Sequence, residues 1–158
     1  MKHHSIKINL IVFLFAIILF YPNFSFALFE RKGQVEIITT DGKLQKFNVE
    51  FARSEAEKAT GLMFRERLAD DEGMLFMWNT SSLRQFWMKN TLIDLDIIFI
   101  NSNYRVVHIE ASAKKGSSRI ISSILPIQYV LEINAGQSQL RKITPGALLS
   151  SKNLPICC

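Results

Sequence analysis

Cysteine is scarce in this sequence, and its placement limits the covalent chemistry of the fold. The chain of 158 residues has two cysteines, Cys157 and Cys158, which are its last two residues. The folded body before them therefore has no disulfide, although export would permit one. Neighbouring cysteines can close only a small, strained ring, and a cross-link between two chains is the alternative. We expect the pair to belong to a frayed, exposed tail over residues 150–158.

Nucleophile motifs are absent as well. The sequence has no Gly-x-Ser-x-Gly elbow and no glycine-rich phosphate loop. Of its three histidines, His3 and His4 precede the first long apolar run, which leaves His108 for any catalytic triad, and no serine is marked out to join it. Whether the protein is an enzyme is therefore open, and no cofactor is expected.

Charge of one sign is not concentrated anywhere in the chain. The formal net charge is +5, but the basic residues are scattered, and their longest runs are the pairs Arg31-Lys32, Lys114-Lys115 and Arg141-Lys142. A nucleic-acid footprint would need basic residues clustered on one face. The composition therefore predicts a mildly positive surface and no nucleic-acid partner.

The longest apolar run is too short to cross a bilayer comfortably. Residues 8–21 are apolar apart from Asn9, whereas a transmembrane helix needs about 20 residues. Lysines precede the run, and Ser25 and Ala27 place small residues at −3 and −1 of a cut after Ala27. We predict a signal peptide over residues 1–27 and one exported domain over 28–158, in the periplasm or outside the cell. The alternative is an inner-membrane anchor over residues 8–29, and the membrane is a partner only in that case.

The rest of the chain alternates short apolar segments with turn signals. Asp41-Gly42 between apolar runs predicts a hairpin with strands over 35–40 and 44–51. Ser54 and Glu57 form a capping-box pattern, which predicts a short helix that ends at Gly61. The remaining apolar runs predict strands at 74–78, 84–89, 95–100, 104–110, 127–133 and 147–149, with a helical turn at 137–142 and a long loop at 111–126. The pattern predicts a mainly β, compact single domain, a β-sandwich or barrel-like body with its core over 35–149 and one or two short helices.

The stretch from Phe86 to Phe99 concentrates polar residues in an apolar setting. Lysine and aspartate are costly to bury unless they are paired, so the polar residues here either pair with each other or line a pocket. Trp87 offers an aromatic platform, and an arginine such as Arg65 can hold a carboxylate with two hydrogen bonds. The candidate pocket therefore consists of Arg65, Trp87, Lys89, Asn90 and Asp96.

Two further acidic positions require partners. Glu132 interrupts an apolar strand, and if it points inward our candidate partner is Arg65. Asp96 would face His108 if residues 101–103 form a three-residue loop, with Asp94 and Glu110 near by, but a slip of one residue would separate them. Because a catalytic metal centre needs three well-placed ligands, we predict no metal site.

Six segments in this order carry a family resemblance: Gly61-Leu62-Met63-Phe64-Arg65, Gly73-Met74-Leu75-Phe76, Phe86-Trp87-Met88-Lys89-Asn90-Thr91, Leu95-Asp96-Ile97-Ile98-Phe99, Tyr129-Val130-Leu131-Glu132-Ile133 and Ala135-Gly136. Together they resemble the bacterial and archaeal family called domain of unknown function 192 (DUF192), over about residues 35–149. The resemblance implies a compact, mainly β domain, often behind a signal peptide, and it implies no activity. The chain departs from the family pattern at Asp94, where proline is usual, at Ala147, where aspartate is usual, and in loop 111–126, which lacks additional prolines.

Three functions are compatible with these residues. The first is a non-catalytic binding or accessory module of the cell envelope, whose pocket binds a small polar or anionic ligand or an envelope protein. The second is a hydrolase or lyase that uses Lys89 and Asp96 as its acid–base pair. The third is a structural motif that locks the sheet, while loop 111–126 contacts other proteins. They differ in whether the polar side chains of the central stretch face an open cleft or are consumed by each other.

Overall fold

The computed structural model describes residues 31–157, and the predicted signal peptide lies outside this range. Within the described range, no helix is both long enough and apolar enough to span a bilayer. Short strands dominate, and the elements are β1 (Lys32–Ile38), β2 (Leu44–Ala52), α2 (Glu55–Thr60), β3 (Glu72–Ser82), β4 (Gln85–Phe86), β5 (Leu95–Ile100), β6 (Val106–Ala113), β7 (Ile121–Ser122), β8 (Ile127–Asn134), α3 (Gln137–Leu140) and β9 (Leu148–Leu149).

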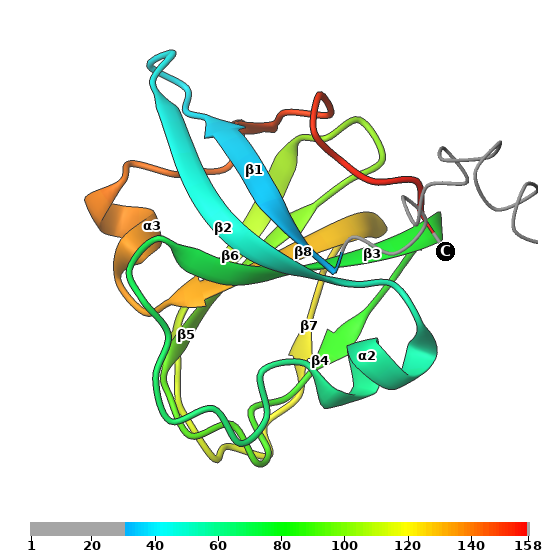
Figure 1. Cartoon of the computed structure of the whole chain (residues 1–158), viewed down its shortest axis with the longest axis vertical. Helices are drawn as coiled ribbons and strands as arrows, with labels where there is room; N and C mark the ends of the chain where they lie inside the picture. Colours follow the sequence, from blue (N-terminus) through cyan, green and yellow to red (C-terminus); the bar gives the residue numbers. More distant parts are fainter. Residues whose placement is uncertain (1–30, 158) are drawn as a thin grey trace, which may run out of the picture. The chain divides into compact units, whose positions relative to one another are not determined.

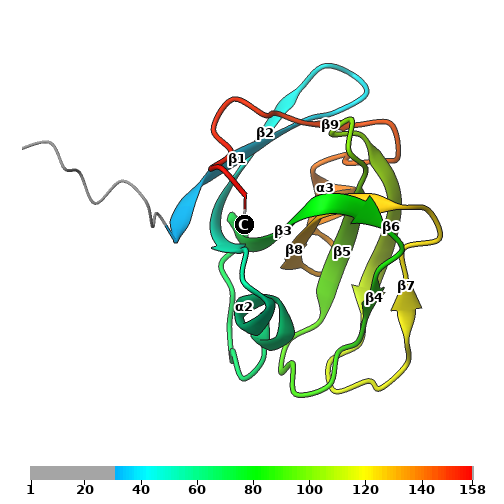
Figure 2. The same ribbon diagram turned by 90° about the vertical axis from the view of Figure 1, so that its right-hand side faces the viewer.

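One curled sheet organises the domain. Its seven strands run in the order β6-β5-β8-β3-β2-β1-β9, and all neighbours are antiparallel except β2 and β3. A parallel pair needs a crossover connection, which here is α2 and the loop that follows it. The sheet bends far enough for Leu148 in β9 to form a bridge with Arg105, the residue just before β6, so its two edges meet at one end (Figures 1 and 2). The predicted mainly β, barrel-like body with short helices is therefore confirmed.

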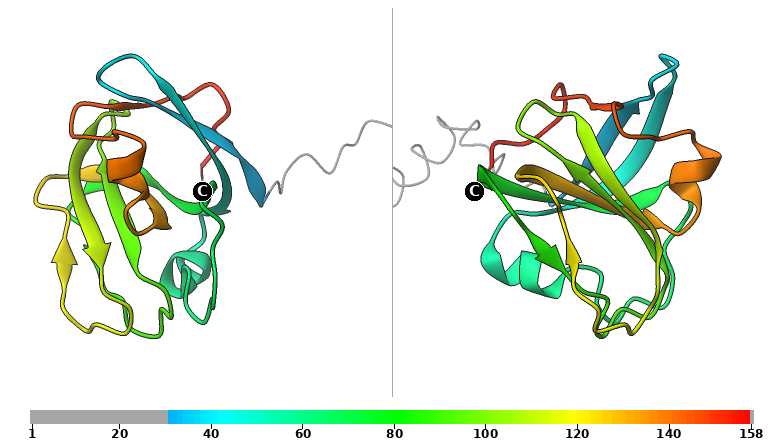
Figure 3. Two further views of the ribbon diagram at one scale, coloured as in Figure 1. Left: turned by 90° about the vertical axis from the view of Figure 1, so that its left-hand side faces the viewer. Right: turned by 180° about the vertical axis from the view of Figure 1, so that it is seen from behind.

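Both faces of the sheet are covered, which divides the core into two apolar clusters. Alternate residues of a strand point to opposite faces, so β5 sends Ile98 and Ile100 to the first cluster and Ile97 and Phe99 to the second. The second cluster also contains Leu62, from the crossover. The β4–β7 ribbon pairs separately from the main sheet, and Figure 1 shows it on the same side of the sheet as α2. Figure 3 shows α3 well away from α2.

The local predictions are largely confirmed. The Ser54 hydroxyl accepts the Glu57 N–H, and the Glu57 carboxylate accepts the Ser54 N–H, which completes the capping box. The hairpin forms, but its turn spans residues 39–43, closed by a hydrogen bond from the Thr39 N–H to the Lys43 carbonyl. The turn is therefore wider than the two-residue turn that Asp-Gly favours.

Three predictions are wrong. The long loop predicted over 111–126 is shorter and interrupted, because β6 continues to Ala113 and β7 covers Ile121–Ser122. The strand predicted over 84–89 is limited to Gln85–Phe86, and the chain beyond it forms turns. The tail after residue 150 is not frayed throughout, because Leu154 and Cys157 pack against the first cluster. Cys157 is also disulfide-bonded.

Candidate functional site

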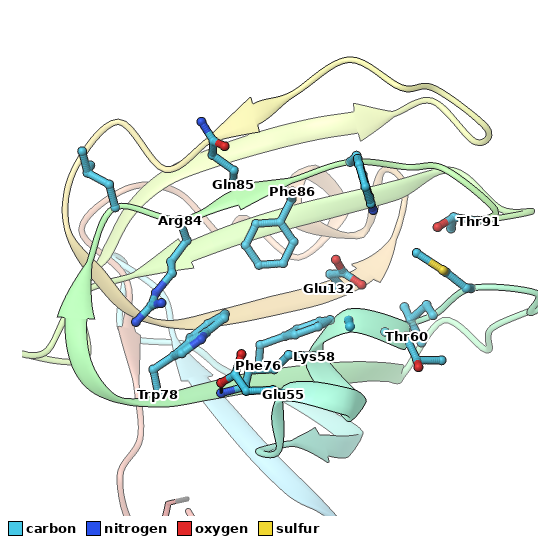
Figure 4. Close-up of a pocket in the computed structure, with 16 residues that line it drawn as sticks. Glu55, Lys58, Thr60, Phe76, Trp78, Arg84, Gln85, Phe86, Thr91 and Glu132 are labelled. Carbon is cyan, nitrogen blue, oxygen red and sulfur yellow. Dashed lines mark ion pairs between the residues drawn. The ribbon is translucent and has the colours of Figure 1, made fainter.

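A cleft of about 580 Å³ opens on the side of the sheet that carries the second cluster. We call it the α2–β4 cleft. Its lining residues come mainly from α2, β3 and β4 and from the loops that directly follow these three elements. Figure 4 draws the 16 lining residues. Its volume lies within the range of about 300–1,000 Å³ that small-molecule sites occupy. Trp78 and Trp87, the two tryptophans of the chain, both line it.

The walls of the cleft are aromatic. The Phe86 ring meets Phe76 edge-on at 5.5 Å and Trp78 edge-on at 6.3 Å, measured between ring centroids. Phe86 also contacts Phe99 of the second cluster at 5.8 Å. This edge-to-face packing holds the rings in fixed orientations. The cleft therefore has a largely preformed apolar wall.

Three cations lie close to the two tryptophan rings of the cleft. The Lys58 Nζ lies 5.2 Å from the centroid of the Trp78 ring, and the Arg84 guanidinium carbon lies 4.7 Å from it. The Lys89 Nζ lies 5.8 Å from the centroid of the Trp87 ring. All three distances fall within the reach of cation–π attraction, about 6 Å.

Glu132 is a buried acid at the floor of the cleft. It lies in the middle of β8, and the register places Met74 of β3 and Ile97 of β5 beside it. Only 6% of the surface of Glu132 is exposed to solvent. Among residues 31–157, no side chain or backbone group forms a hydrogen bond or ion pair with its carboxyl. Figure 4 shows this carboxyl pointing into the space between Phe86 and the residues of α2. Burial raises the pKa of Glu132 to about 8, because the charged form is poorly solvated there.

The backbone beneath Glu132 is held by a close approach of two strands. A Cβ atom on Gly73 would lie 2.6 Å from the Glu132 carbonyl oxygen, a distance that real Cβ atoms do not adopt. Only glycine at this position lets β3 pair with β8 so closely. The Gly-Met-Leu-Phe segment therefore fixes the position of Glu132.

Glu132 belongs to a row of three acids that crosses one face of the sheet. Paired residues place Glu110, Ile97, Glu132, Met74 and Glu50 side by side on β6, β5, β8, β3 and β2. The outer two acids each have an arginine partner. Arg119 pairs with Glu110, and Arg65 pairs with Glu50 at 2.6 Å. The predicted pair of Arg65 and Glu132 is therefore wrong, and the central acid of the row has no such partner.

Asp96 lies on the opposite face and is fully enclosed. Its Oδ1 accepts the Ser112 N–H at 2.8 Å, and its Oδ2 accepts the Ser138 N–H at 2.9 Å and the Ser138 hydroxyl at 2.7 Å. The residue has no exposed surface. These bonds tie β5 to the start of α3 and to β6, so Asp96 has a structural role.

The five residues of the predicted pocket do not gather in one place. Trp87 lines the α2–β4 cleft, whereas Arg65 is engaged by Glu50. Lys89 is exposed beside Trp87, and no ion pair joins it to Asp96. Asn90 is exposed, with a positive φ of 60°, and its carbonyl accepts the Phe64 N–H at 2.8 Å. Of the motif residues 87–91, Trp87 and Thr91 line the cleft, and the motif does not form a polar pocket of its own.

The proposed neighbours of Asp96 are separated by the sheet register. His108 lies opposite Phe99, three positions from Asp96, and its ring stacks on Phe99 at 5.6 Å. Asp94 binds Lys114 at 2.8 Å and the Lys115 N–H at 2.9 Å. Within residues 31–157 there is no group of three His, Cys, Asp or Glu side chains that could hold a metal ion.

Sequence reasoning missed most of the cleft. Lys58, Phe76, Trp78 and Arg84 come from three separate segments, and no local pattern links them. Glu132 did give a signal, because one acid in the run Tyr-Val-Leu-Glu-Ile must be paired or placed at a site. The signal identified the residue, but not its surroundings.

Fold and cleft define a small, mainly β domain with a curled sheet and a lateral aromatic cleft. The chain belongs to the DUF192 family, described as "Uncharacterized ACR", whose model matches residues 36–151. The resemblance noted from the six segments is thereby confirmed. The family has no established activity.

Two solved structures share the fold. A protein from Sinorhizobium meliloti 1021, described as a "putative transcription regulator", is 38% identical, with a TM-score of 0.74 over 75% of this chain and 92% of that one. A protein of unknown function from Novosphingobium aromaticivorans DSM 12444 is 40% identical, with a TM-score of 0.73 over 75% of this chain and 84% of that one. Among curated proteins, none matches this chain.

Proposed function

We propose that the domain is a non-catalytic binding module of the cell envelope and that the α2–β4 cleft is its ligand site. The observation that carries the proposal is the Glu132 carboxyl, which belongs to a largely buried residue at the cleft and has no hydrogen-bond partner among the described residues. A buried polar group without a hydrogen bond costs about 1–3 kcal/mol. Such a cost is expected where a ligand supplies the missing partner, because functional sites are commonly held at the expense of stability.

The same geometry supports binding more than the acid–base alternative. A catalytic pair needs two groups within reach of one substrate, whereas Asp96 is enclosed by three hydrogen bonds and Lys89 is exposed beside Trp87. The aromatic walls favour a ligand with an apolar body. The envelope setting rests on the predicted signal peptide over residues 1–27, and it makes an envelope component the natural ligand.

Intrinsic fluorescence tests the proposal directly, because both tryptophans line the cleft. The full chain is titrated with a panel of small aromatic and aliphatic acids, amides, amines and sugars. We expect at least one class to give a saturable change in tryptophan emission, together with a raised melting temperature.

A matched pair of variants assigns the binding to the cleft. Ala59 lies on the exposed side of α2 and lines the cleft, whereas Ala56 lies on the same helix outside it. Ala59→Trp is expected to fill the cleft and abolish the response in both assays, while Ala56→Trp keeps it. A panel without any binder, or equal binding by the two variants, would contradict the proposal.

A further inference from the structure

We infer that the α2–β4 cleft binds an organic carboxylate with a flat apolar body, whose anionic end accepts a hydrogen bond from the Glu132 carboxyl near the cations at Trp78 and Trp87. This inference rests on the proposed function and adds the class of ligand. Three observations carry it: the cations beside the two tryptophan rings, the charge balance of the cleft and the position of Glu132.

The aromatic faces argue against a cationic ligand. An ammonium ion is usually held over the open face of a tryptophan or phenylalanine ring. Here Lys58 and Arg84 already lie over Trp78, and Lys89 lies over Trp87. A cationic ligand would compete with these side chains for the rings and would be repelled by their charge.

The charge balance of the cleft favours an anion. Glu55 neutralises Lys58, whose Nζ lies 2.7 Å from the Glu55 carboxylate. Arg84 has a hydrogen bond from its guanidinium to the Thr80 carbonyl at 3.1 Å, but its buried Nε has no partner, and no carboxylate of the described residues pairs with it. Lys89 likewise has no carboxylate partner in the described range. Arg84 also helps to lower the pKa of Glu55, so this one carboxylate faces two lining cations, Lys58 and Arg84. Lys89 beside Trp87 adds a third positive charge, and the surroundings of the cleft are therefore net positive.

Glu132 supplies a hydrogen-bond donor rather than a negative charge at neutral pH. Its pKa of about 8 keeps the carboxyl protonated there, and a neutral carboxyl in an apolar site can donate its proton to a ligand oxygen. The groups around it do not oppose this state. Met74 and Ile97 flank it, α2 presents the Glu55–Lys58 pair, and β4 presents Phe86 next to Arg84. The other acids of the same sheet face, Glu50 and Glu110, are each neutralised by an arginine.

Three ligands that share the same aromatic skeleton but carry a negative, a neutral or a positive end group test the inference. Calorimetric titration of the full chain compares 3-phenylpropionate, 3-phenylpropionamide and 3-phenylpropylamine. We expect the acid to bind about tenfold more tightly than the amide, which is the effect of one partly screened charge, and the amine to bind most weakly. Equal affinities, an amine that binds best, or no binding by the acid would overturn the inference.

Variants and pH locate the two partners of the carboxylate. Arg84→Gln is expected to weaken binding of the acid about tenfold and leave the amide unchanged, whereas the exposed Arg67→Gln outside the cleft changes neither. Glu132→Gln keeps a hydrogen-bond donor and should still bind 3-phenylpropionate, whereas Glu132→Leu lacks a donor and should no longer bind it. In the unaltered chain the acid should bind more weakly as the pH rises above about 8, and Glu132→Gln should remove that dependence.

The outcomes separate this inference from the proposed function. Binding of another ligand class that Ala59→Trp abolishes would leave the cleft a binding site and overturn only the choice of a carboxylate. Absence of any cleft-dependent binding would overturn both. Circular dichroism of each variant confirms that a lost signal reflects the site and not the fold.

Discussion

Two buried acids on neighbouring strands of this domain have opposite surroundings. Asp96 on β5 accepts three hydrogen bonds from Ser112 and Ser138 on the face of the first cluster. Glu132 on β8 lies on the face of the second cluster, beside apolar residues, and borders an open cleft. The acid with matched donors holds elements of the fold together. The acid without them marks the place where an external partner fits.

Burial alone does not distinguish these two roles. Both residues are more than nine-tenths buried, so the difference lies in what the protein offers to each carboxyl. Donors placed by a helix start and a neighbouring strand solvate Asp96. At Glu132 no donor of the described residues forms a hydrogen bond with the carboxyl, and the proton stays on the acid instead.

The largest expected effect is at Asp96. Asp96→Asn replaces one of the two acceptor oxygens by an NH₂ group, which is a donor. If Oδ1 is replaced, the NH₂ group faces the Ser112 N–H; if Oδ2 is replaced, it faces the N–H and hydroxyl of Ser138. Because buried donors would lose their partner, we expect the free energy of unfolding to fall by about 3 kcal/mol. At about 3–6 °C per kcal/mol for a domain of this size, the melting temperature should fall by roughly 10–15 °C. Ser138→Ala removes one of the three hydrogen bonds and should cost about 1 kcal/mol. If Asp96→Asn costs less than about 1 kcal/mol, the structural role of Asp96 is refuted.

An opposite and smaller effect is expected at Glu132. Glu132→Leu removes a buried carboxyl that has no hydrogen-bond partner among the described residues. At pH 4.5, where the pH-linked loss of stability has barely begun, the free energy of unfolding should therefore rise by about 1–3 kcal/mol. Between the ordinary glutamate pKa of 4.5 and the raised value of about 8, the folded state holds a proton that the unfolded state releases. Stability therefore falls as the pH rises across this window, by up to about 1.4 kcal/mol per pH unit.

Chemical denaturation at several pH values measures this effect. The slope between pH 4.5 and 8 should be present in the unaltered chain and absent in Glu132→Gln, and the difference between the two isolates Glu132 from the other carboxyls. Below pH 4.5 the two proteins should respond alike, because Glu132 is protonated in both the folded and unfolded states. Parallel curves over the whole range would mean that Glu132 is solvated or paired.

The smallest effect is expected at Arg65, and it distinguishes the two possible partners of that arginine. Both members of the Arg65–Glu50 pair are about one-third exposed, and such pairs contribute at most about 1 kcal/mol. Arg65→Ala should therefore cost about 1 kcal/mol or less and leave the pH slope from Glu132 unchanged. A changed slope in this variant would show that Arg65 interacts with Glu132 after all.

The sequence predicted the parts of the fold that depend on near neighbours. The capping box of Ser54 and Glu57 joins residues three positions apart, and both of its hydrogen bonds are present. In the sequence, Phe47, Val49 and Phe51 alternate with polar residues, a pattern that predicts one apolar face, and all three belong to the first cluster. The strand predicted over 84–89 failed because β4 finds a partner only in the two-residue strand β7, far along the chain.

The candidate site was predicted only in part for a related reason. Trp87 does line the cleft, and Glu132 was recognised as an acid that needs a partner. The partner of Arg65 was wrong, because Glu50 and Glu132 lie on the same face of the sheet and the sequence does not say which one the arginine reaches. Asp96 and Lys89 are close in sequence, but one is enclosed and the other is exposed.

The sequence by itself determined the class of the domain, its family, its short helix and most of its strands, because capping, turns and alternation depend on residues a few positions apart. The tertiary structure alone decided which carboxyl is satisfied and which is left at a cleft. That outcome depends on the pairing of β8 with β3 and β5, and a shift of one residue in either register would move Glu132 to the other face.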